Sequence, residues 1–165
     1  MKITTITFNL IITYLFTLAG FISSLSTTLV FQFTEYPFIT NPFITYSTLG
    51  AFLASLLVAP LIRISIKEKA IGRVLLLSLV VLVAATAIFV PFIANIEPLF
   101  AGDYFISILM TLIFSSWATI PSSLIAGAFS YKILNKLNAV KSITITAYNA
   151  HTEFSHNSSR NTLRV

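Results

Sequence analysis

The stretch FITYSTLGAFLASLLVAPLIRISIKEKAIGRVLLLSLVVLVAATAIFVPFI, residues 43–93, decides the fold of this chain. It contains two apolar runs, 43–61 and 74–93, on either side of the basic connection 63–73. Each run is long enough to cross the ~30 Å hydrocarbon core of a bilayer as a helix. Because the connection is short, the sequence predicts a tight antiparallel pair of membrane helices.

Two further apolar runs, at residues 8–31 and 104–131, flank this pair. None of the four runs contains Asp, Glu, Lys, Arg or His, and all are longer than the ~10-residue strands of a membrane β-barrel. The sequence therefore predicts an all-α integral membrane protein with four transmembrane helices in an antiparallel bundle. The first run is too long for the apolar region of a signal peptide, and we interpret it as an uncleaved span.

Composition supports a bilayer environment. The 165 residues are 56% hydrophobic and 9% charged, whereas a soluble domain of this size has about 25% charged residues. The chain has no cysteine, which excludes disulfides, thiolate metal sites and a cysteine nucleophile. The net charge of +5 is spread over segments next to membrane spans, so we assign it to topology and anionic headgroups and expect no nucleic-acid partner.

The basic residues indicate the orientation. All ten Lys and Arg residues fall before the first run, between the second and third runs, or after the fourth. The two remaining connections contain Glu35, Glu97 and Asp103 and no basic residue. By the positive-inside rule, both termini are predicted to be cytoplasmic. Small size and this asymmetry favour the cytoplasmic (inner) membrane of a bacterium.

The composition changes after residue 137. Residues 1–137 are predicted to form the membrane domain, and residues 138–165, rich in Asn, Ser and Thr, a disordered cytoplasmic tail. His151, Glu153 and His156 in this tail do not have the spacing of a zinc-protease motif, so we expect no metal site and no other cofactor.

Small and hydroxyl-bearing residues recur every three or four positions and so share helix faces. The candidate seam consists of Thr13, Thr17, Gly20 and Ser24 in the first run, Gly50 and Ala54 in the second, and Ser115, Thr119, Ser122, Ser123 and Gly127 in the fourth. An adjacent row in the first run contains Ala19, Ser23 and Thr27. Such faces commonly pack helices together in lipid. The alternative is a polar seam that lines a path for a solute.

Pro121 and Trp117 bear on the shape and the packing of the fourth run. Pro121 removes a helical hydrogen bond to the Trp117 carbonyl, so the sequence predicts a kink that neighbouring hydroxyls stabilise. Trp117 lies too deep for the aromatic belt at the membrane surface, and we expect it to pack against a neighbouring span.

The absence of ionisable residues in the runs argues against proton relays and membrane-embedded acid–base catalysis, so we expect no enzymatic activity. The main hypothesis is an accessory, structural or immunity-type protein that acts by helix packing with a membrane partner. The alternative is a transporter or channel for a small solute that works as a homo-oligomer.

Overall fold

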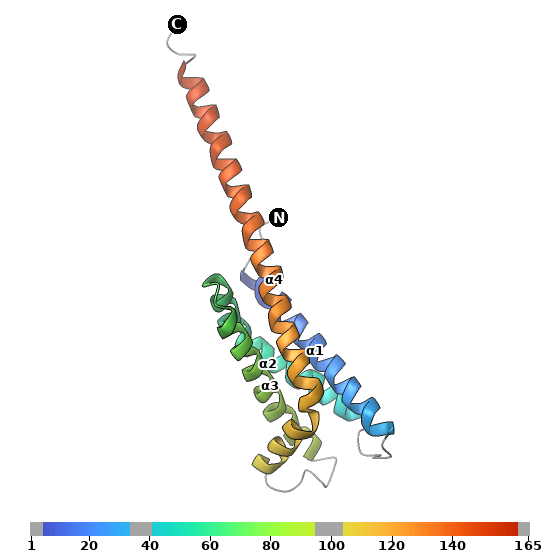
Figure 1. Cartoon of the computed structure of the whole chain (residues 1–165). Coiled ribbons are helices and arrows are strands. Elements are labelled where there is room, and N and C mark those ends of the chain that lie inside the picture. The colour runs from blue at the N-terminus through green and yellow to red at the C-terminus, as the bar shows by residue number, and fades with distance from the viewer. Residues whose placement is uncertain (1–4, 34–40, 95–103, 162–165) are drawn as a thin grey trace. The chain divides into compact units, whose positions relative to one another are not determined.

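The computed structural model describes residues 5–33, 41–94 and 104–161, and these form long helices (Figure 1). The helices are α1 (Thr5–Phe33), α2 (Asn41–Lys67), α3 (Ile71–Ala94) and α4 (Tyr104–Asn161). Each contains a stretch long and apolar enough to cross a membrane, namely Thr5–Val30, Phe43–Lys67, Ile71–Pro91 and Phe105–Leu137. The predicted set of four long apolar helices that pack together is confirmed.

The second helix, α2, packs against both α1 and α3 (Figure 1). Glycines bring these helices close together, since a Cβ built on Gly20 of α1 would lie 2.5 Å from the Cβ of Ala51. On the other side of α2, a Cβ on Gly50 would lie 2.7 Å from the main-chain oxygen of Ala85 in α3. Small residues therefore set the spacing of the three helices, as they do in other membrane bundles.

The connection between α2 and α3 is a tight turn, as predicted. Lys69 has a φ of 56°, in the left-handed region that ends many helices. The amide of Lys69 donates to the Ile66 carbonyl over 3.1 Å, and the amide of Ala70 donates to the Ser65 carbonyl over 3.0 Å. This is the bond pattern of a Schellman cap, with lysine at the position that usually holds glycine.

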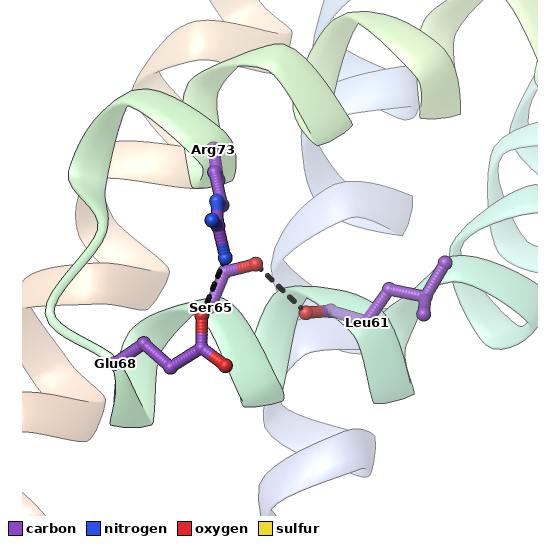
Figure 2. A network of polar contacts seen from close by, with 4 residues as sticks. All are labelled: Leu61, Ser65, Glu68 and Arg73. Atoms are coloured by element: carbon purple, nitrogen blue, oxygen red, sulfur yellow. Dashed lines mark hydrogen bonds and ion pairs between the residues drawn. The ribbon is translucent and has the colours of Figure 1, made fainter.

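Side chains add polar contacts at the same turn (Figure 2). Arg73 and Glu68 form an ion pair with 2.6 Å between Nη1 and Oε2, and the Ser65 hydroxyl donates to the Leu61 carbonyl over 3.1 Å. The ion pair is well exposed, and such pairs contribute about 0–1 kcal/mol. The main-chain cap is therefore the more important feature of the turn.

The chain divides into two compact units, Met1–Tyr131 and Lys132–Val165. In the second unit, the described residues up to Asn161 continue helix α4. This differs from the disordered tail that the sequence predicts for residues 138–165. No Gly or Pro follows Gly127, so nothing in the sequence interrupts the helix. The acidic residues Glu35, Glu97 and Asp103 lie outside the described residues.

The two halves of the first unit are packed differently. Near the α2–α3 turn, Ile62 and Ile66 of α2 and Val74 of α3 are fully buried, as is Ile12 of α1. A buried serine, Ser78, lies there against Gly127 of α4. The half remote from the turn contains the cavity described next.

Candidate functional site

A cavity of about 60 Å³ lies inside the first unit and is lined by residues from all four helices. Half of the lining residues are Ser or Thr: Ser23, Ser24 and Thr27 on α1, Ser47 on α2, Thr86 on α3, and Ser115, Thr119, Ser122 and Ser123 on α4. Residues with hydroxyl groups thus make up half of the lining of a partly open pocket, but its exposed wall is mostly apolar.

The cavity occupies the half of the bundle that is remote from the α2–α3 turn. Its lining residues lie between Phe43 and Ala51 on α2 and between Val81 and Phe89 on α3. Three phenylalanines complete the wall, namely Phe16, Phe43 and Phe89. The rings of Phe43 and Phe89 meet edge to face, with centroids 5.8 Å apart. This contact ties the first turns of α2 to the last turns of α3 beside the cavity.

The hydroxyls around the cavity are bonded to their own helices. On α4, Ser115 donates to the Thr111 carbonyl over 2.7 Å and Thr119 donates to the Ser115 carbonyl over 2.9 Å. Such bonds to the preceding turn satisfy a hydroxyl in an apolar environment. They also fix the direction of each side chain.

The structure brings together more than half of the residues that the sequence singles out. Those that line the cavity are Gly20, Ser24, Ser115, Thr119, Ser122 and Ser123. The adjacent row of Ala19, Ser23 and Thr27 lines it as well. These residues belong to α1 and α4, which the sequence identified as its two most hydroxyl-rich spans.

The remaining candidates lie outside the cavity lining. Gly50 and Ala54 lie in the packed body of α2, and Gly127 contacts Ser78 of α3. Thr13 is buried, and Thr17 donates to the Thr13 carbonyl over 2.8 Å. Some residues of the candidate seam thus pack helices together and others surround the cavity, and the solute path stays a prediction.

Helix α4 continues without a break through Pro121, which is exposed on the outside of the helix. The hydroxyl of Ser122 donates to the Ala118 carbonyl over 2.7 Å, and that of Ser123 to the Ile120 carbonyl over 3.0 Å. The kink at Pro121 stays a prediction.

The expected burial of Trp117 against a neighbouring span is wrong, because its side chain is 48% exposed. Depth along the helix was used for that prediction, but the helix face determines burial.

Several lining residues were not found from the sequence. Ser47, Thr86 and the aromatic residues Phe16, Phe43 and Phe89 line the cavity but belong to no candidate set. A signal for Thr86 did exist, because Thr86 and Ser78 are the two hydroxyl residues in the apolar run 74–93. Thr86 lines the cavity, and Ser78 lies against Gly127.

Some buried polar atoms of the described residues have no hydrogen-bond partner. Ser23 Oγ is the one on a cavity-lining residue, and its side chain is only 3% exposed. The others are Asn9 Oδ1, Thr13 Oγ1, Ser130 Oγ and the Nε and Nη1 atoms of Arg63. Ser23 Oγ has almost no accessible surface, so it is buried in the wall rather than presented to the cavity.

The lining offers hydrogen bonds and apolar contacts but no fixed charge. No lining residue is Asp, Glu, Lys, Arg or His, and no group of His, Cys, Asp or Glu among the described residues is suited to hold a metal ion. The arrangement suits a small uncharged molecule that is held chiefly by apolar contacts, and its lining contains no Asp, Glu, Lys or His for acid–base chemistry. Comparisons with protein families, curated proteins and solved structures find no match to this chain.

Proposed function

We propose that this chain is a non-enzymatic, multi-pass membrane protein that binds a small uncharged polar solute and works as a homo-oligomeric transporter or channel. The cavity carries this proposal, because it places nine hydroxyls inside a bundle of apolar helices. Helix packing alone does not require such a space. Four spans are few for a complete solute path, so we expect several copies of the chain to assemble.

The use of the glycines supports this proposal over a purely structural role. Gly20, Gly50 and Gly127 are all in close contact with other helices of the same chain. The small-residue faces that suggested docking onto a partner are thus used within the bundle. The cavity itself is not used by these contacts, and solute binding would give it a role.

The predicted orientation of the chain determines in which half of the bilayer the cavity lies. The basic residues favour a cytoplasmic α2–α3 turn and cytoplasmic termini, in the inner membrane of a bacterium. In that orientation the cavity lies in the outer half of the bilayer and the closely packed half faces the cytoplasm. The cavity would accept a solute from outside, and repacking near Ser78 and Gly127 would have to precede release inside.

Flux through proteoliposomes tests this proposal, with glycerol and urea as the permeant probes. Vesicles that contain the full chain should admit both probes faster than protein-free vesicles in a stopped-flow light-scattering assay. Joint replacement of Ser24, Ser122 and Ser123 by Ala should reduce entry about fivefold, because three polar groups of the lining are lost. Thr17→Ala is the control, since Thr17 lies outside the lining. Equal rates with and without protein would contradict the proposal.

A second function, as an accessory or immunity-type protein, is favoured by the exposed Trp117. Thirteen residues separate Trp117 from the start of α4 at Tyr104, which places it about 20 Å into the membrane. There its indole N–H has no water to bond, and lipid offers no partner. A helix of a partner protein would cover it.

Recovery of a partner tests this second function. The tagged chain, extracted from its native membrane in mild detergent, should bring a stoichiometric protein with it, and Trp117→Ala should lose that protein. For the immunity form, deletion of the chain should sensitise the cell to a pore-forming toxin. A clean homo-oligomer from the same extraction would reject a partner and favour the transporter.

A further inference from the structure

Arg63 is a cation inside the apolar part of α2. It lies one turn before the end of this helix at Lys67, within the stretch Phe43–Lys67 that is long and apolar enough to cross a membrane. The residue is only partly exposed, and its Nε and Nη1 atoms are buried without a hydrogen-bond partner. A guanidinium stays protonated at any ordinary pH. Its charge is therefore held in an apolar setting, which is strongly unfavourable unless an anion compensates it.

The described residues supply no anion to Arg63. Glu68 is the one acidic residue among those described in the first unit, and its carboxylate pairs with Arg73 over 2.6 Å. The carbonyl end of α2 adds only a partial negative charge. The counter-charge of Arg63 must therefore come from outside this part of the chain.

Asn9 of α1 lies at the same level of the bundle but does not bond to Arg63. Asn9 lies eleven residues before Gly20, and Arg63 lies twelve residues after Ala51. Both are thus about 17–18 Å from the close contact of Gly20 with Ala51, measured along antiparallel helices (Figure 1). The Oδ1 atom of Asn9 is itself buried without a partner, so it does not accept a bond from the guanidinium.

The residues around Arg63 favour an anionic ligand from the membrane. Lys67, Lys69 and Arg73 are all exposed at this end of the bundle and outnumber Glu68. In the orientation that the basic residues favour, this end lies in the cytoplasmic leaflet, where basic clusters beside membrane helices attract anionic headgroups. Arg63 precedes Lys67 by one turn, about 6 Å, and so lies deeper in the membrane than the lysines.

We propose that Arg63 binds the phosphate group of an anionic phospholipid at this end of the bundle. Nε and Nη1 are enclosed by the protein, so the lipid phosphate contacts the remaining nitrogen, Nη2, on the partly exposed side of the residue. The positive charge is delocalised over the guanidinium, and a contact at Nη2 therefore compensates it. The site is independent of the cavity and of the solute proposed above.

Thermal unfolding of the full chain in detergent tests the site. Dioleoylphosphatidylglycerol, at about ten times its dissociation constant, should raise the melting temperature by about 3–6 °C. Dioleoylphosphatidylcholine has the same acyl chains and a phosphate group but no net charge, and it should give a much smaller rise. Equal rises with the two lipids would overturn the proposal.

Two substitutions distinguish a site at Arg63 from diffuse attraction to the basic turn. Arg63→Gln should abolish the difference between the two lipids. Lys67→Gln is the matched control, because it removes one charge from an exposed residue in the last turn of the same helix, and it should keep most of the difference. Equal losses in the two variants would overturn the site. So would an Arg63→Gln protein that unfolds at a lower temperature by the same amount with and without phosphatidylglycerol, because Arg63 would then only pack against its neighbours.

Inorganic phosphate distinguishes the lipid from a soluble ligand with the same chemistry. Sodium phosphate should leave the melting temperature as it is in sodium chloride of equal ionic strength. A rise with phosphate that Arg63→Gln abolishes would overturn the lipid as the ligand and assign the site to a soluble phosphate compound.

Discussion

At the scale of single residues, glycines decide how closely the helices approach. Gly50 and Gly72 are both helical, but Gly50 is crowded and Gly72 is not. A Cβ built on Gly50 would lie 2.7 Å from the Ala85 main-chain oxygen, whereas a Cβ built on Gly72 would have nothing within 4 Å. Gly50→Ala should therefore lower the free energy of unfolding by about 1–3 kcal/mol. Gly72→Ala should raise it by about 0.5–1 kcal/mol, because alanine favours the helix. Thermal unfolding in detergent measures both, and equal effects would contradict the close approach of α2 and α3.

Lys69 gives a second prediction at this scale. Its left-handed φ of 56° costs a residue with a Cβ about 1–2 kcal/mol, and glycine does not have this cost. Lys69→Gly should raise the melting temperature, with a gain of about 1 kcal/mol in the free energy of unfolding. Lys69→Ala removes the same charge but keeps a Cβ, and so should give no gain. A similar gain in both variants would assign the effect to charge rather than to the backbone.

At the scale of helices, one close pair of small residues contributes to the contact of α3 with α4. A Cβ on Gly127 would overlap the Ser78 hydroxyl, so Gly127→Leu should separate the two helices and lower the free energy of unfolding by more than about 2 kcal/mol. Ala128→Leu adds the same side chain at an exposed position and should have little effect. Chromatography and thermal unfolding of the two variants measure the difference, and a stable, monodisperse Gly127→Leu protein would contradict the packing described.

Prediction from sequence succeeded best for the elements themselves. The runs at 8–31, 43–61, 74–93 and 104–131 each lie within one helix, because continuous apolar segments of that length have few other solutions in lipid. The ends were less accurate, since α2 continues beyond Arg63 to Lys67 and α4 continues to Asn161. Charge shows where the membrane ends, but a helix ends only where a cap or breaker stops it.

The candidate site was predicted only in part, for a physical reason. Hydroxyls at helical spacing on α1 and α4 identified Ser24 and Ser122, because periodicity shows which residues share a face. It cannot show which faces meet. Thr86 and Phe89 of α3 were missed for this reason, and the exposed face of Trp117 was assigned wrongly.

At the scale of the whole molecule, the orientation follows from charge and is open to direct test. Reporter fusions after Lys69 and after Leu137 should both be cytoplasmic, and a fusion after Thr40 should be external. An external reporter at Leu137 would require an odd number of spans or a cleaved first span, and an external reporter at Lys69 would reverse the assignment of the cavity to the outer half.

The central claim is that water reaches a hydroxyl-lined cavity inside the bundle, and two neighbouring residues of α1 test it most directly. Ala19 lines the cavity, whereas Leu18 is 41% exposed on the outer surface of the helices and does not line it. The measurement is the reaction of Ala19→Cys and Leu18→Cys, in proteoliposomes, with the small uncharged reagent methyl methanethiosulfonate, which needs a hydrated thiolate. The account predicts that Cys at residue 19 reacts readily and that Cys at residue 18, in lipid, does not. Equal reactivity, or reaction at residue 18 alone, would contradict it.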